Sequence, residues 1–215
     1  MSIIRLTDNL ILISLTTVYL FVLIFSAIDP HSWDIWIAEI LPVLFILIGI
    51  WFASSHYTFS KTAYFLMFIW IIMHSIGAKY TFAEVPFDWF NTLIQSPRNN
   101  YDRVAHFSIG FYAYPIAEYL IAKSKYPIKF AQCFALFTIM SVASGYEIIE
   151  WWYADIAGGE AGIAFLGSQG DMWDAQKDML CDTLGAITVL LLLTLQLARN
   201  PLRFKIDNDL NEPNH

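Results

Sequence analysis

The chain has 215 residues, of which 57% are hydrophobic and only 14% are charged, and its formal net charge is −7. A soluble domain of this length would be close to one-quarter charged, so the composition excludes an ordinary soluble domain and indicates an integral membrane protein. The acidic balance, without a basic stripe, also excludes a nucleic-acid-binding surface.

Six apolar stretches follow one another along the chain, and a bilayer-spanning helix needs about 20 such residues. Short polar turns separate most of them, and no polar linker divides the chain into domains. We therefore expect an all-α polytopic protein whose six transmembrane helices form one bundle over residues 1–200, followed by a polar cytoplasmic tail over 201–215. The predicted spans cover residues 10–28, 36–53, 62–78, 102–122, 128–152 and 174–198.

Three features within this plan carry further expectations. Residues 79–100 form a long connection without helical periodicity, and such a connection in a compact protein is usually functional, so we expect it to cover a site. Pro115 should kink the fourth span because proline removes a backbone hydrogen bond. Cys133 and Cys181 lie in apolar runs, which favours two buried unpaired thiols and leaves a disulfide between them open.

The distribution of charge predicts the orientation. With six spans both termini lie on one side of the membrane, and eight of the 12 Lys and Arg residues fall on that side. The positive-inside rule then places both termini in the cytoplasm. Most of the 19 acidic residues fall on the opposite, outer side.

The outer ends of three spans carry acidic residues at helical spacing. The members of each set lie three or four residues apart and therefore share one face of their helix. The sets are Asp102 with His106, Glu147 with Glu150, and Asp174 with Asp178 and Asp182. Because successive spans alternate in direction, all three sets are expected at one depth, together with His74 near the outer end of the third span. Asp171, in the glycine-rich loop before the last span, can join the last set.

We interpret this cluster as a pocket for a divalent metal ion. Carboxylates a few ångströms apart must either raise their pKa or bind a cation, and only Arg103 and Lys177 are expected nearby as permanent cations. Oxygen ligands with one or two imidazoles suit Mg²⁺, Mn²⁺, Ca²⁺ or Zn²⁺. The predicted metal ligands are Asp102, Glu147, Glu150, Asp171, Asp174, Asp178 and Asp182. The predicted catalytic residues are His106 or Glu147 as general base and Arg103 as the contact for an anionic group.

Each of these residues also has a simpler interpretation. Asp102 and Asp174 could be N-terminal helix caps, and His74 and His106 could be hydrogen-bonded core histidines. Ion pairs between helices could account for the glutamates. The pairs would be Glu147 with Arg103 and Glu150 with Lys177.

Three motifs occur in order along the second half of the chain. They are Asp102-Arg103-x-x-His106, Gly145-x-Glu147-x-x-Glu150-Trp151, and Gly167-x-Gln169-Gly-Asp171-x-Trp-Asp174-x-x-x-Asp178-x-x-x-Asp182-x-x-Gly185-Ala186. With these motifs the chain resembles the YjdF-type family of bacterial inner-membrane proteins. The resemblance implies a multi-pass protein of the bacterial inner membrane and implies no substrate. The chain is more distantly similar to VanZ-like membrane proteins, but its additional acids and Gly-Ser-Gln-Gly loop mean that a role in glycopeptide resistance is not carried over.

Three functions remain in competition at this stage. The first is a metal-dependent hydrolase or transferase that acts on a lipid-linked or phosphate-bearing envelope substrate. The second is a cation- or proton-coupled transporter that uses the same acids. The third is a non-catalytic envelope scaffold. In each case the lipid bilayer is the expected surrounding, and the sequence leaves the oligomeric state open.

Overall fold

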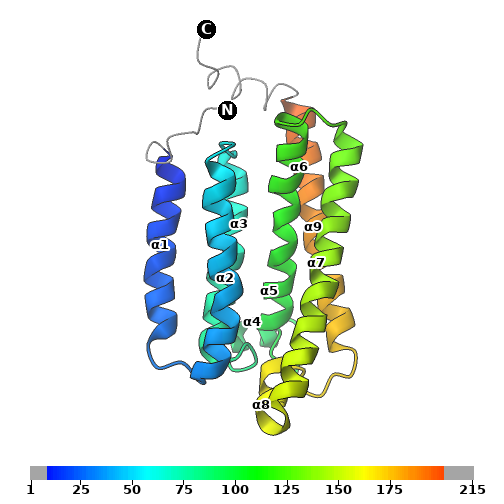
Figure 1. Cartoon of the computed structure of the whole chain (residues 1–215). Helices are drawn as coiled ribbons and strands as arrows, with labels where there is room; N and C mark the ends of the chain where they lie inside the picture. Colours follow the sequence, from blue (N-terminus) through cyan, green and yellow to red (C-terminus); the bar gives the residue numbers. More distant parts are fainter. Residues whose placement is uncertain (1–8, 201–215) are drawn as a thin grey trace.

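The computed structural model describes residues 9–200, and its regular elements in this range are all helical (Figure 1). The elements are α1 (Leu10–Ala27), α2 (Trp33–Ser54), α3 (Lys61–Tyr80), α4 (Asp88–Leu93), α5 (Tyr101–Ile109), the 3₁₀ turn η2 (Gly110–Tyr112), α6 (Ala113–Ala122), α7 (Ile128–Ala157), α8 (Gly159–Leu166) and α9 (Asp174–Arg199). The predicted all-α fold is confirmed. The predicted tail over 201–215 lies outside the described residues.

Six crossings of the membrane follow from these elements. The helices α1, α2, α3, α7 and α9 are each long and apolar enough to span a bilayer. The fourth crossing consists of α5, η2 and α6 in succession. Its helix tightens at Gly110–Tyr112, shortly before Pro115, which cannot donate a backbone hydrogen bond. Pro115 thus explains why this crossing is interrupted.

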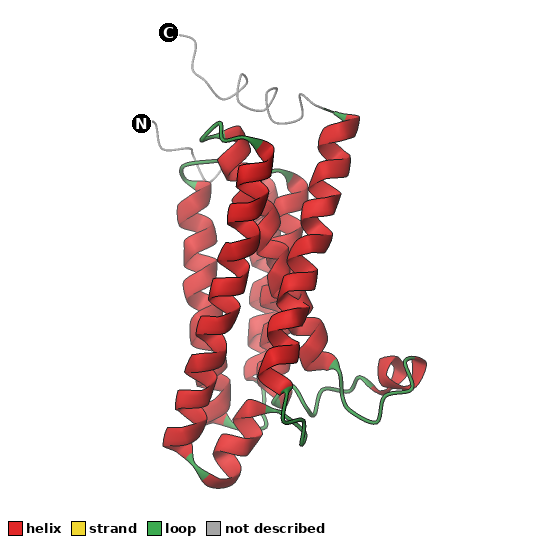
Figure 2. Ribbon diagram, turned by 90° about the vertical axis from the view of Figure 1, so that its right-hand side faces the viewer, coloured by secondary structure: helices red, strands yellow, loops and turns green. Residues whose placement is uncertain are grey.

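Successive crossings run in opposite directions along a common axis (Figures 1 and 2). Leu10 and Arg199 therefore lie at the same end of the bundle, which we call the terminal end. The opposite end carries α4, α8 and the loops around them, and we call it the loop end. The short helices α4 and α8 were not predicted, and α7 extends five residues beyond the predicted span.

The core of the bundle forms around α3, the most enclosed of the long helices. It packs against α1, α2, α5 and α6. Tyr64, Phe68 and Ile71 on this helix are almost completely buried. By contrast α1 and α2 expose most of their apolar side chains, as expected for helices that face lipid.

Exposed tryptophans gather at the loop end. All five are more than half exposed, and tryptophans are enriched where a membrane meets water. They are Trp33, Trp89, Trp151, Trp152 and Trp173. This placement agrees with an aromatic belt at the loop end.

The two cysteines do not form a disulfide. Cys133 lies on α7 and Cys181 on α9, and both are free thiols. Cys133 is exposed on the outside of the bundle and Cys181 is only half-buried, so the expectation of two buried side chains was wrong.

Candidate functional site

The site depends on an unusually close approach of α5 and η2 to α9. A Cβ atom on Gly185 would overlap the carbonyl oxygen of Phe107, and a Cβ atom on Gly110 would overlap the backbone of Asp182 and Ala186. Only glycine permits this backbone contact. The contact turns the acidic face of α9 directly toward the face of α5 that carries Asp102 and His106.

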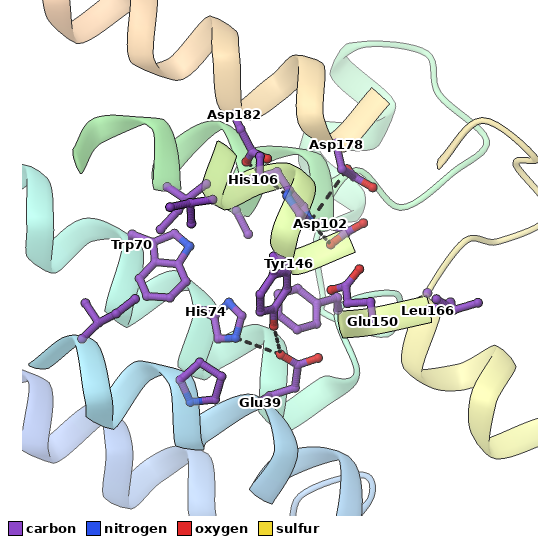
Figure 3. Close-up of a pocket in the computed structure, with 18 of the residues that line it drawn as sticks. Glu39, Trp70, His74, Asp102, His106, Tyr146, Glu150, Leu166, Asp178 and Asp182 are labelled. Carbon is purple, nitrogen blue, oxygen red and sulfur yellow. Dashed lines mark hydrogen bonds and ion pairs between the residues drawn. The ribbon is translucent and has the colours of Figure 1, made fainter. Parts of the chain in front are cut away.

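His106 of α5 lies among three aspartates (Figure 3). Its Nδ1 atom is 3.2 Å from Oδ1 of Asp182, and its Nε2 atom is 3.6 Å from Asp102 and 4.0 Å from Asp178. One ligand atom from each of Asp102, His106 and Asp178 lies within 4.8 Å of the others. Asp182 is 1% exposed and Asp178 is 3% exposed, so these carboxylates are shielded from bulk water. The residues can therefore converge on one small ion.

Two arginines neutralise part of this charge. Arg103 forms an ion pair with Asp178 and lies 2.5 Å from Asp174 and 3.3 Å from Asp171. Arg98, from the loop before α5, is 2.7 Å from Asp174 and 3.6 Å from Asp102. The expectation that only Arg103 and Lys177 would supply permanent charge was wrong, because it left out Arg98. Because α5 begins at the loop end, His106 lies about one helical turn deeper in the bundle than Arg103.

Asp171 belongs to the surface of the site. Lys177 donates a hydrogen bond of 2.6 Å to its Oδ2 atom, and the backbone N–H of Trp173 donates to Oδ1 at 3.1 Å. The hydrogen bond from Lys177 lowers the pKa of Asp171 below its ordinary value. Asp171 is thus a stably ionised partner of cationic side chains.

The glutamates of α7 do not form the ion pairs that the simpler interpretation proposed. Arg103 and Lys177 have aspartate partners, and no ion pair is formed by Glu147 or Glu150 within residues 9–200. The Oε1 atom of Glu147 is buried and has no hydrogen-bond partner in that range. Such a buried oxygen is costly unless a ligand or a proton satisfies it.

Helix capping does not account for the aspartates either. The residues at the cap positions of α5 and α9 are Asn100 and Trp173, and neither makes a side-chain capping bond. Asp102 and Asp174 lie within the first turns, and their carboxylates contact arginines. The capping interpretation is therefore wrong for both.

A second polar group faces the cluster from α2, α3 and α7. Oε2 of Glu39 accepts a hydrogen bond of 2.9 Å from the hydroxyl of Tyr146 and lies 2.9 Å from Nε2 of His74 (Figure 3). Sequence reasoning did not select Glu39 or Tyr146. The available signal was that Glu39 is the lone acid of the predicted span 36–53, since an ionisable residue in a span is usually functional or paired.

Both polar groups line a single pocket at the loop end. Its polar wall includes Asp102, His106, Glu150, Asp178 and Asp182 on one side and the Glu39 group on the other. Its remaining wall is largely apolar, with side chains from α2, α3, α5, α7 and α8. Four of the predicted site residues do not line the pocket, namely Arg103, Glu147, Asp171 and Asp174.

The loops beside the pocket are fixed to one another. The side chain of Gln169 exchanges two hydrogen bonds of 3.0 Å with the backbone of Asn99. Arg98 donates to the carbonyl oxygen of Ser168 at 2.5 Å. Gln169 can hold this position because its backbone adopts a positive φ of 50°. These contacts keep the guanidinium of Arg98 over the aspartates.

The predicted cover over residues 79–100 contributes one side chain to the pocket wall. That side chain is Phe82. Asn99 donates hydrogen bonds to the carbonyl oxygens of Ala83 and Val85, which folds the segment back on itself. The segment therefore borders the site and supplies Arg98 to it.

Comparisons with known proteins agree with this architecture. Residues 11–199 match the model of the family described as predicted membrane protein (DUF2238). The chain is also 31% identical over 189 residues to the inner membrane protein YjdF of Escherichia coli (strain K12). The aligned residues cover 85% of this chain and 88% of the relative. No solved structure matches the chain. The family model covers nearly the whole membrane-spanning bundle. The chain therefore belongs to the DUF2238 family of multi-pass inner-membrane proteins.

Proposed function

We propose that the protein is a metal-dependent hydrolase or transferase of the cell envelope. The observation that carries the proposal is the convergence of Asp102, His106 and Asp178 within 4.8 Å beside a pocket whose other walls are apolar. A water-soluble substrate would have no apolar part to contact the apolar walls of this pocket. A lipid-linked or phosphate-bearing substrate would use both parts of the pocket.

The charges around the pocket support a bound cation. Its carboxylates outnumber the arginines and lysine that contact them, and Oε1 of Glu147 is buried without a hydrogen-bond partner in the described part of the chain. Asp102, Asp178 and His106 would hold a divalent ion, and the donor set suits Mg²⁺, Mn²⁺ or Zn²⁺. Such an ion supplies Lewis acidity to a phosphoryl or carbonyl oxygen.

The remaining residues have distinct roles in this proposal. Glu150 is the glutamate of α7 that lines the pocket, and it would act as the general base. Arg98 and Arg103 would hold the aspartates in place and attract an anionic group of the substrate. The positive-inside rule places the loop end, and with it this chemistry, on the periplasmic side.

A coupled transporter is the less favoured function. It would need a polar path from the site to the terminal end. Glu118, the buried acid nearest that end, is occupied by Tyr57 and Ser60 and serves the packing of the bundle. A scaffold without metal remains the function that a negative metal test would favour.

The test is the metal content of the purified protein. The detergent-solubilised chain is incubated with Mg²⁺, Mn²⁺, Ca²⁺ or Zn²⁺, freed of unbound ions and analysed by mass spectrometry of the elements. The cluster variant is Asp102→Asn/Asp178→Asn. The matched control is Asp88→Asn/Asp155→Asn, which removes two exposed acids at the same end. We expect stoichiometric metal in the wild type and control and a loss of at least tenfold in affinity for the cluster variant. Equal metal in both variants, or none in the wild type, would contradict the proposal.

A further inference from the structure

A groove runs along the bundle between α2 and α7, toward the terminal end from the acidic pocket. Side chains of α2, α3, α5, η2, α6 and α7 line it, and nearly all of them are apolar. On the α2 side it contains Phe45, Gly49 and Phe52, and on the α7 side Phe134 and Thr138. The groove therefore has the polarity of a lipid environment.

The groove adjoins the acidic pocket. Four residues line both spaces, and they come from α2, α5 and α7. They are Ile46, Ile109, Ile139 and Val142. These four side chains form the border between the two spaces, so a molecule in the pocket would pass between them to reach the groove.

The groove opens to the side of the bundle. Helix α2 packs against α3, whereas α7 packs against α6, α8 and α9, so α2 and α7 stand on opposite sides of the space (Figure 1). Phe45 and Phe52 are 71% and 69% exposed on one side, and Phe134 is 50% exposed on the other. In a membrane these surfaces contact hydrocarbon. Lateral access from the bilayer is therefore open.

The length of the combined space fits a lipid. Glu39 in the pocket and Ala53 in the groove are 14 residues apart on α2, which corresponds to about 21 Å at 1.5 Å per residue. That distance is more than half of the hydrocarbon thickness of a bilayer, about 30 Å. Lys123 and His56 lie at the far end, where the groove reaches the terminal end.

We infer that the groove holds the hydrocarbon chain of a membrane lipid whose polar head group lies in the acidic pocket. The inference rests on the proposed function and defines its substrate class. The order of the two spaces, polar and then apolar, matches the order of head group and chain in a lipid. A transmembrane helix from a second copy would fill the groove but would have no use for the polar pocket at its end. The substrate therefore enters sideways from the bilayer, between α2 and α7.

Photolabelling tests this inference. The full chain is reconstituted in nanodiscs doped with a phosphatidylglycerol that carries a diazirine near the end of one acyl chain, and the labelled peptides are mapped by mass spectrometry. The groove variant is Gly49→Trp, because a side chain at Gly49 meets no atom within 4 Å and would fill the space. Its control is Ile48→Trp, since Ile48 is 64% exposed and lies outside the groove. A second pair, Thr138→Trp with the control Phe137→Trp, tests the opposite wall.

The expected labels lie on residues 45–53 and 134–142, and the groove variants should reduce them several-fold while the controls do not. Equal labelling of the outward face of α1, or equal loss in variant and control, would overturn the inference. Disappearance of a dimer in Gly49→Trp, without groove labels in the wild type, would assign the groove to a second copy instead. Metal content is measured on the same preparations. Intact metal binding with no groove labelling would refute the lipid groove alone, whereas labelling without metal would refute the metal-dependent function alone.

Discussion

Buried acids lie at both ends of the bundle, and they are stabilised in different ways. At the terminal end Glu118 is completely buried and accepts hydrogen bonds from the backbone N–H of Ser60 at 2.7 Å, its hydroxyl at 2.6 Å and the hydroxyl of Tyr57 at 3.2 Å. At the loop end the acids share arginines and a histidine, and one glutamate oxygen has no partner among the described residues.

This difference separates a structural acid from a candidate functional one. Glu118 has a donor for each oxygen, and it fixes the turn before α3 to α6. The loop-end acids have more negative charge than their cations neutralise, and they line a pocket. Ligand binding is expected where charge is left uncompensated. Substitution of an acid and removal of a bound ion should therefore have different effects at the two ends.

The largest effect is expected from Arg103→Met. The substitution leaves the buried Asp178 without its arginine, whereas Asp174 keeps Arg98, and it should lower the free energy of unfolding by about 3–5 kcal/mol. Denaturant unfolding in detergent measures it. The control is Lys177→Met, whose side chain is 52% exposed and should cost less than about 1 kcal/mol. Equal losses in the two variants would show that the arginine pairs are no more important than a surface pair.

Glu118→Ala should lower the free energy of unfolding by about 3 kcal/mol, because donors of Ser60 and Tyr57 lose their acceptor. Glu118→Gln should lose less, since its amide oxygen still accepts from Ser60. Metal content should stay at the wild-type level in both. A Glu118 variant that folds normally but binds no metal would contradict the assignment of Glu118 as a structural acid.

Removal of metal should affect the loop end alone. At a free metal concentration 100 times the dissociation constant, binding stabilises the folded state by about 2.7 kcal/mol, so a chelator should lower the Tm of the wild type and of Glu118→Gln equally. Asp178→Asn should show no chelator effect. A chelator effect that persists in Asp178→Asn would place the ion elsewhere.

The smallest effect is expected for Asp171→Asn, and it should depend on pH. The folded-state pKa of Asp171 is lowered, so its stabilising contribution is fully present above the ordinary aspartate pKa and is lost as the pH falls through the folded value. The Tm difference between wild type and variant should therefore be present at pH 6 and shrink below about pH 4. A difference that grows on acidification would contradict the ion pair with Lys177.

Much of the site was accessible from the sequence because depth in a membrane follows from span order. The alternating direction of six crossings predicts that His106, Glu150 and Asp178 lie at one end, and all three line the same pocket. The four-residue intervals place Asp102 with His106 and Asp178 with Asp182, and all four line the pocket. At the three-residue interval Glu150 lines the pocket and Glu147 does not. The length of an apolar stretch and the helical period depend only on residues close together in the sequence, so both can be predicted without the structure.

Which acid meets which cation was not accessible in this way. The pairs depend on how each helix is rotated about its axis, and the contact of Gly110 and Gly185 sets that rotation for α5 and α9. Arg98 was missed because its position depends on Asn99 and Gln169, which lie 70 residues apart and bind each other only in the folded chain.

By itself, then, the sequence determined the all-helical membrane fold, the number of crossings and the gathering of acids at one end, since burial of apolar residues in lipid fixes all three. Only the tertiary structure decided that Glu39 and Tyr146 join His74 opposite the aspartates, and that a groove between α2 and α7 adjoins the pocket. Those features arise from side chains on different helices, whose distances are set by packing and have no signature in local spacing.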